Sequence, residues 1–374
     1  AISISLKPLH RTFHRLSQTY GQVYSLRFGS RLVVIVSYLS AVEECFTKND
    51  MVLANRPRFL LGKHIGYNYT TMSSSSYRDH WRNLRRICTL EIFSTNRLNM
   101  FSGIRKDEVK HLLRKLSKSN NNSGGFAKVE LKSMLLELTF NIITRIVAGK
   151  RYYGYGEDEK DEKEAKQMMR LAARTDVFLH GLIDEVRSKD KEGNTMINHL
   201  LSLQRSEPEY YTDQIIKGLT QVLIVAGTDT SAMTLEWAMS NMINLPHLSS
   251  NDCTIGGYDT PCDTMLLVNA WAIYRDPKLW DDATSFKPER FGMNESDLYK
   301  LMPFGLGRRA CPGTGLARRT LGLTLGSMIQ CFEWQRVTME EVDMAEGNGV
   351  TMPKVKPLEA MCKARPIMHK VMTK

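Results

Sequence analysis

The residues best suited to chemistry in this chain lie in the segment PFGLGRRACPGTG, residues 303–315. Cys311 stands in a glycine-rich turn and directly before a proline, where we expect a helix to begin. The free N–H groups and the positive dipole end of a helix favour a thiolate over a thiol. Arg309 offers a fork of donors to a carboxylate, and the glycines permit close approach of a large flat ligand. The segment therefore predicts a thiolate beside a bound ligand.

Four roles are open to the Cys311 sulfur when it is considered alone: nucleophile, redox sensor, metal ligand, or small buried hydrophobe, the commonest of the four. A phosphatase-type anion loop needs Arg six residues after the cysteine, where this chain has Ala317. A dinucleotide-binding GxGxxG starting at Gly313 needs a third glycine at the position of Arg318. Residue spacing therefore excludes both a phosphatase-type loop and a dinucleotide-binding motif at this segment.

A second group of polar residues, 227–231, interrupts the apolar segment VLIVAGTDTSAMTLEW, residues 222–237. Local propensity disfavours Gly, Thr, Asp, Thr and Ser in the middle of a helix. One interpretation is a helix break that is capped again by Asp229. The other is an acid and an alcohol, Asp229 and Thr230, held in a dry groove where they pass protons from water to a bound ligand. Considered together with the cysteine segment, the second interpretation is favoured.

A third motif, HWRNLRR, occupies residues 80–86. Trp81 and Arg85 are four residues apart and share one helix face, so an indole N–H and a guanidinium can point at the same anion. Taken alone, such a segment is more often an ordinary amphipathic helix. It serves only to corroborate the other two motifs.

Composition limits the class of protein that can carry these motifs. The 374 residues are 42% hydrophobic and 24% charged, as in a globular protein, and the net charge of +11 favours acidic partners. Seven irregularly spaced cysteines without zinc-ligand spacing indicate a reducing compartment. No segment approaches the roughly 20 apolar residues of a membrane span, and no signal peptide opens the chain.

Hydrophobic periodicity predicts a mainly helical chain with small sheets towards its two ends. Residues 24–37 are expected to form two strands around a Phe-Gly-Ser turn, and a helix should follow over 40–50. Loops are expected at 117–125, a solvated charge run at 155–166, and short strands after Pro246 and near the C-terminus. Further helices are expected over 80–93, 101–116, 128–149, 211–227 and 316–334, the last of them being the final helix.

These motifs together resemble the cytochrome P450 superfamily of haem-thiolate monooxygenases. Five positions match the family's FxxGxRxCxG loop: Phe304, Gly307, Arg309, Cys311 and Gly313. NAWAIYRDP (269–277) and FKPERF (286–291) are also similar, and FLLGKHIGYNYTT and PKVKPLEAMCKARP look like the plant flavonoid and isoflavone hydroxylase branch, including isoflavone 2'-hydroxylases. The resemblance implies a single P450 domain over residues 1–374, mainly α with small β-sheets. Haem b would be buried between a long central helix and the cysteine-ligand loop.

The resemblance also implies a role for each matched residue. Cys311 would be the axial thiolate ligand of the haem iron, and Asp229 and Thr230 would relay protons to bound dioxygen. Further cofactor-binding residues would be Trp81, Arg85, Ala226, Gly227, His247, Phe304, Arg309 and Gly313, the alanine and glycine letting the helix bend over the haem. The substrate pocket would include Ser74, Ser75, Val222, Leu223, Ala226, Leu245, Val350 and Thr351.

The implied reaction uses O2 and NADPH-derived electrons, delivered by a flavoprotein reductase, to oxidise an aromatic plant metabolite such as a flavonoid, isoflavone or lignan. Hydroxylation and oxidative ring closure use the same chemistry. The implied location is the cytosolic face of the endoplasmic reticulum membrane, through an N-terminal anchor that these residues do not include, and no nucleic-acid partner is implied. Two alternatives are a haem-thiolate isomerase or dehydratase that needs no reductase and a non-catalytic haem-binding sensor. The proton relay argues against the isomerase.

A basic face for the acidic reductase would include Arg82, Arg86, Arg308, Arg318 and Arg319; the alternative is that these arginines belong to an ordinary solvated surface.

The chain departs from the family pattern in its length. Between Asp229 and Cys311 no Glu has Arg three residues later, although the family places such a pair there to lock the core near the thiolate. Only 82 positions separate the two residues, too few for the helices expected between them. We therefore expect segments to be missing near 168–170 and 244–245. A chain that truly lacks them is not expected to bind haem stably.

Overall fold

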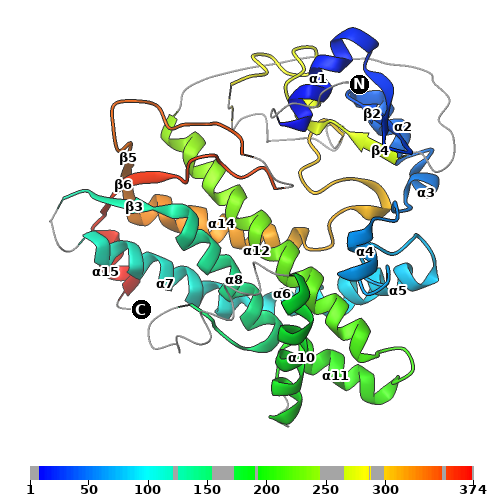
Figure 1. Ribbon diagram of the computed structural model, residues 1–374. Coiled ribbons are helices and arrows are strands. Elements are labelled where there is room, and N and C mark those ends of the chain that lie inside the picture. The colour runs from blue at the N-terminus through cyan, green and yellow to red at the C-terminus, as the bar shows by residue number, and fades with distance from the viewer. Residues whose placement is uncertain are drawn as a thin grey trace. The chain divides into compact units, whose positions relative to one another are not determined.

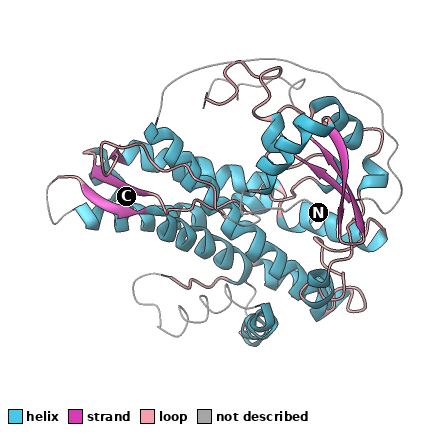
Figure 2. Cartoon of the chain, turned by 45° about the horizontal axis from the view of Figure 1, so that its top comes forward, coloured by secondary structure: helices cyan, strands magenta, loops and turns pink. Residues whose placement is uncertain are grey.

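The computed structural model describes residues 8–120, 125–153, 172–189, 193–244, 265–285, 287, 299–347 and 351–372. Helices dominate the described residues, and two small sheets accompany them (Figure 1, Figure 2), which confirms the predicted fold class. The chain divides into two compact units, Ala1–Pro57 with Leu245–Cys311 and Arg58–Asn244 with Pro312–Lys374. The single domain over 1–374 stays a prediction.

The first unit contains a three-stranded sheet. Strands β1 (Val23–Phe28) and β2 (Arg31–Val36) pair antiparallel, and β4 (Met265–Val268) pairs parallel to β2. Gly29, with φ of 62°, takes the left-handed conformation that the turn between β1 and β2 requires. The predicted hairpin over 24–37 is confirmed.

The two faces of β2 pack into separate apolar clusters, because alternate side chains of a strand point to opposite faces. Val33 and Ile35 pack with Phe13, whereas Val34 and Val36 belong to the other cluster. The helical segments of this unit are α1 (Leu9–Tyr20), α2 (Leu39–Phe46), α3 (Asp50–Leu53), α13 (Ala270–Ile273) and the 3-10 turn η4 (Gly307–Arg309).

The second unit is mainly helical, with the long helix α12 (Asp213–Asn244) packed along α8 (Leu131–Ala148) and α7 (Ser102–Asn120) packed on α8 in turn (Figure 1). Most of the buried apolar side chains lie here in one large cluster, and α8 contributes buried side chains to it from several of its faces. The other helical segments are α4 (Leu60–His64), α5 (Asp79–Ile87), the π-helical turn η1 (Cys88–Ile92), α6 (Thr95–Met100), α10 (Ala172–Ser188), α11 (Met196–Ser206), α14 (Thr314–Cys331) and α15 (Ile367–Met372).

An antiparallel sheet in the order β3 (Ala127–Glu130), β6 (Glu359–Ala364), β5 (Phe332–Gln335) completes the second unit. Four predictions were wrong in this unit. Residues 128–130 and 332–334 are strands rather than helix ends, because both pair with β6. Residues 117–120 extend α7 instead of forming a loop, and α15 follows the helix that was predicted to be the last. The charge run 155–166 lies outside the described residues.

Candidate functional site

The loop before Cys311 is held closed by backbone contacts within the first unit. The N–H of Cys311 donates to the carbonyl oxygen of Phe304 at 2.8 Å. Gly305 and Gly307 have φ of 68° and 63°, a region that glycine adopts without strain. Asp50 Oδ1 accepts the N–H of Arg308 at 3.0 Å, and a Cβ on Gly307 would overlap that same oxygen. The glycines therefore serve the tight path of this loop.

Cys311 differs from the other described cysteines in its exposure. Of the five cysteines in the described residues, Cys311 alone is exposed. Burial raises the pKa of Cys88 to about 12 and that of Cys362 to about 11, so both stay protonated at neutral pH. The interpretation of Cys311 as a small buried hydrophobe is therefore wrong in this structure, whereas a role as ligand or nucleophile needs such access.

The helix after the cysteine begins later than expected. Its first helical residue is Thr314, and Gly313 is the N-cap, because the carbonyl of Gly313 accepts the N–H of Ala317 at 2.9 Å. The prediction that Pro312 is the first helical residue is wrong, since Pro312 lies in a turn. The helix dipole is thus further along the chain from Cys311 than the sequence argument assumed.

Arg309 is anchored within the first unit. Its Nε donates to the carbonyl oxygen of Ala54 at 2.6 Å, and its side chain is half-buried. This bond fixes the orientation of the guanidinium. Its role towards a haem propionate stays a prediction, as do those of Phe304 and Gly313.

Helix α12 runs without a break through 227–231, so the interpretation as an interrupted helix is wrong. Hydroxyl groups bond back along the helix instead: Thr230 Oγ1 donates to the carbonyl of Ala226 at 2.6 Å, and Thr234 Oγ1 donates to that of Thr230 at 2.7 Å. Such bonds let Thr sit inside a helix without an unpaired donor. Asp229 is half-buried beside them.

One strip of α12 is exposed although much of the rest of the helix is buried. Ala226, Thr230 and Thr234 are spaced by four residues and are all exposed, as is Val225 beside them at 59%. Small side chains and an apolar residue at the centre of a 32-residue helix form a surface that a large flat ligand can cover. Thr234 was missed by the sequence argument, although its spacing from Thr230 could have revealed it.

Gly227 faces α8 rather than this strip. A Cβ built on it would lie 2.6 Å from Ile143 Cδ1, so the glycine allows the two helices to approach closely. The predicted function of Gly227, bending the helix over haem, stays a prediction, but the structure gives the residue a packing function.

On α5, Trp81 is buried, and its indole N–H donates to the carbonyl of Met72 at 3.0 Å. His80 makes a similar contact from Nε2 to the carbonyl of Thr70 at 2.8 Å. The helix thus holds the preceding loop in place. For Trp81 to donate to a propionate, its indole N–H must give up the hydrogen bond to Met72. Arg85, the other predicted propionate ligand on this helix, is half-buried. Both roles stay predictions.

The predicted substrate residues fall into three groups. Val222 and Ala226 share one face of α12, whereas Leu223 packs against the core. Ser75 is buried, and the Ser74 hydroxyl lies 2.7 Å from that of Thr71. Thr351 is half-buried; the remaining residues, Leu245, Val350 and the haem-binding candidate His247, lie outside the described residues.

These features fit a haem. The donor set offers one exposed thiol, which is the single protein ligand that haem-thiolate iron requires. The exposed strip of α12 offers small side chains that a porphyrin face can approach.

None of the described helices is long and apolar enough to cross a membrane.

Comparisons with known proteins bear on the whole chain. Residues 2–180, 159–248 and 242–359 match the family model described as Cytochrome P450. The chain is 49% identical to isoflavone 3'-hydroxylase of Medicago truncatula, covering 97% of this chain and 90% of the relative. It is 46% identical to isoflavone 2'-hydroxylase of Glycyrrhiza echinata, covering 98% and 90%. It is also 46% identical to (+)-piperitol/(+)-sesamin synthase of Sesamum radiatum, covering 97% and 88%.

Among solved structures, a zebra fish cytochrome P450 with progesterone has a similar fold, with a TM-score of 0.78 at 21% identity and coverage of 96% of this chain and 100% of that one. The alignment with the Medicago truncatula hydroxylase runs over 452 positions, more than the 374 residues of this chain. The relative therefore carries internal residues that this chain lacks, in agreement with the short span between Asp229 and Cys311.

Proposed function

Because this chain belongs to the cytochrome P450 family and is a haem-dependent monooxygenase, we propose that it oxidises a flat aromatic plant metabolite of the isoflavone, flavonoid or lignan class. The names of its relatives support this class, since two are isoflavone hydroxylases and one is a piperitol and sesamin synthase. Two observations carry the proposal, each within its own unit: Cys311 is exposed in the first unit, and α12 of the second unit has an exposed strip of small side chains.

The chain's own residues would hold the cofactor and deliver protons. Bound haem supplies the activation of O2, with electrons from NADPH through a flavoprotein reductase. Cys311 would ligate the iron as a thiolate, and the arginine beside it, Arg309, would contact a propionate. The Thr230 hydroxyl donates a hydrogen bond to the carbonyl oxygen of Ala226, so its oxygen lone pairs remain available to accept a hydrogen bond at the exposed strip. Asp229, one residue earlier and half-buried, would exchange protons with water and pass them on beside Thr230.

The side chains on the exposed strip would favour a flat substrate. Ala226 and Val222 are small and lie one helical turn apart, so a ring system can lie against α12 without a bulky side chain in its way. The same binding surface is compatible with hydroxylation and with oxidative ring closure of the substrate, because both reactions begin with the removal of hydrogen from a substrate bond. By name, one relative is an isoflavone hydroxylase and another is a (+)-piperitol/(+)-sesamin synthase.

A reductase partner follows from the family, and we place its docking on the exposed arginines of the second unit. Arg86 and Arg318 are exposed, Arg82 is exposed and pairs with Asp79 at 2.5 Å, and Arg319 donates to Asn99. Association with an acidic partner would be steered by these charges and weakened by salt. The fifth predicted residue, Arg308, pairs with Asp50 in the other unit. The endoplasmic reticulum would be the site of this encounter.

The test is the carbon monoxide difference spectrum of the reduced protein. Thiolate-ligated haem gives a strongly red-shifted Soret band, which Cys311→Ala should abolish, whereas Cys45→Ser, a half-buried cysteine of the same unit, should keep it. Well-folded protein without the band would overturn the proposal. With a partner reductase and NADPH, oxidation of an isoflavone or lignan is expected. Thr230→Ala should keep the band but divert electrons to hydrogen peroxide.

A further inference from the structure

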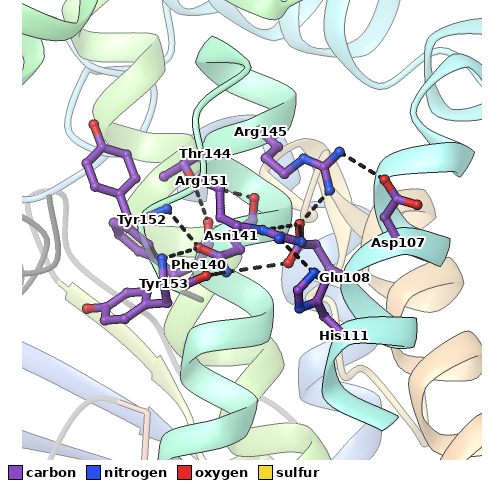
Figure 3. A network of polar contacts seen from close by, with 10 residues as sticks. All are labelled: Asp107, Glu108, His111, Phe140, Asn141, Thr144, Arg145, Arg151, Tyr152 and Tyr153. Atoms are coloured by element: carbon purple, nitrogen blue, oxygen red, sulfur yellow. Dashed lines mark hydrogen bonds and ion pairs between the residues drawn. The ribbon is translucent and has the colours of Figure 1, made fainter. Parts of the chain in front are cut away.

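A half-open groove of about 420 Å³ lies between α7 and α8, with no residue of α12 in its lining. Four of its lining residues, Glu108, His111, Asn141 and Tyr153, belong to the polar network shown in Figure 3. The remaining lining residues are Leu112, Arg114, Lys115, Lys118, Met134, Glu137 and Leu138. Because α8 packs against both α7 and α12, this groove is separate from the exposed strip described above.

A buried carboxylate organises one wall of the groove. Glu108 is only 2% exposed, and its Oε1 accepts from Arg145 Nη1 at 2.5 Å and from Arg151 Nη2 at 2.6 Å (Figure 3). Asn141 ties the chain after α8 to the same wall, since its side-chain oxygen accepts the N–H groups of Tyr152 and Tyr153 at 3.1 Å each. The charge of Glu108 is therefore already neutralised by two arginines.

The rim of the groove is cationic. Arg151 Nη1 lies 2.8 Å from His111 Nε2, and since a guanidinium can only donate, that ring nitrogen accepts and the imidazole is neutral. Burial, and after it the charges of Arg151 and Arg114, lower the pKa of His111, while Glu108 and Asp107 raise it. Lys115 pairs with Glu137 at 2.6 Å. Arg114 has no ion pair within the part of the chain that the structure describes.

The rest of the lining is apolar. Leu112 and Leu138 are buried, each with 4% of its surface exposed, and Met134 and Tyr153 also line the groove. The volume is within the range of small-molecule sites and is too large for a single inorganic anion to fill. A thioether and a guanidinium both interact favourably with an aromatic ring.

From this combination we propose that the α7–α8 groove binds an aromatic carboxylate, a second ligand site apart from the one that takes the oxidised substrate. The carboxylate pairs with Arg114 and with the Lys118 side of the rim, while the ring lies on Leu112, Met134 and Leu138. No bond is made or broken in this site.

Calorimetric titration of the holoenzyme with 4-hydroxycinnamate tests the proposal, with the Soret band monitored in parallel. The groove predicts saturable binding that leaves the Soret band unchanged and that Arg114→Glu weakens at least tenfold. Lys110→Glu changes the same charge on the same helix but does not line the groove, so it should alter the dissociation constant less than twofold. Binding that shifts the Soret band, or that both variants weaken alike, would overturn the proposal.

Three further probes test the ligand class. The methyl ester of 4-hydroxycinnamate lacks the charge, octanoate lacks the ring, and inorganic phosphate lacks the apolar body; each should bind at least tenfold more weakly. Equal binding of any one refutes the need for the group that it lacks. A second readout is the His111 ring signal in NMR: a carboxylate nearby should raise the pKa of His111, and an unchanged titration with bound 4-hydroxycinnamate would place the ligand elsewhere.

Discussion

Replacing Glu108 with Gln is expected to destabilise the second unit substantially. The carboxylate is 2% exposed and receives three charge-assisted bonds, one from Arg145 and two from Arg151. Glutamine keeps the shape but removes the charge, and its amide group turns a donor towards guanidinium donors. Removing one partner of a fully buried ion pair costs about 3–5 kcal/mol, because the remaining charge stays desolvated.

The expected loss is smaller than that limit. The side chains of Arg145 and Arg151 are 23% and 19% exposed, so water screens part of their charge, and Arg145 keeps a second partner in Asp107 at 3.1 Å. We therefore expect a loss of about 2–3 kcal/mol in the free energy of unfolding. For a unit of this size that corresponds to a melting temperature lower by about 4–12 °C.

Circular dichroism melting at a fixed scan rate measures the change, and the adjacent residue provides the control. Asp107 bonds to the same Arg145, but its side chain is 63% exposed, so Asp107→Asn should cost less than about 1 kcal/mol. If Glu108→Gln melts no lower than Asp107→Asn, the buried network contributes no net stability and the reasoning is wrong.

Three other perturbations have definite expected outcomes. Gly227→Ala should cost about 1–3 kcal/mol in unfolding free energy, since its Cβ would lie 2.6 Å from Ile143 Cδ1, and Ile143→Val should recover part of that loss in a double-mutant cycle. Burial raises the pKa of the Glu236 carboxyl above 4.5, so the folded state binds its proton more tightly than the unfolded state, and stability falls as pH rises from about 4.5 through the raised pKa. Glu236→Gln should therefore flatten the dependence of melting temperature on pH in that range. An unchanged slope would exclude Glu236 as the source of the pH dependence. After haem extraction, peptide mapping should find Cys311 alkylated rapidly at pH 7 and Cys88 hardly at all, with restored haem protecting Cys311; equal labelling of both would contradict the assigned ligand.

Local patterns were sufficient for the elements whose structure depends on neighbouring residues. The hairpin over 24–37 follows from apolar alternation around a glycine turn, and both properties lie within fourteen residues. The long helices followed in the same way from apolar spacing of three and four. The cysteine loop was recognisable because five fixed positions agree, which is why the family could be named from the residues alone.

Long-range pairing decided where local patterns failed. Lys128 to Glu130 have helical spacing but form β3, because β6, from far along the chain, supplies their backbone partners. Likewise β4 joins the first sheet from a distant segment, and nothing near it in sequence specifies that register.

What the sequence alone determined about this protein is its chemistry: a thiol in a glycine loop and an acid and alcohol in an apolar helix, since spacing fixes which side chains a short segment presents. Only the tertiary structure decided how those residues are used. It showed that Cys311 is exposed, that Gly227 packs on Ile143, and that the Trp81 N–H is bonded to Met72. The physical reason is that burial and hydrogen-bond partners belong to surfaces formed by distant segments, and the α7–α8 groove exists only once those segments meet.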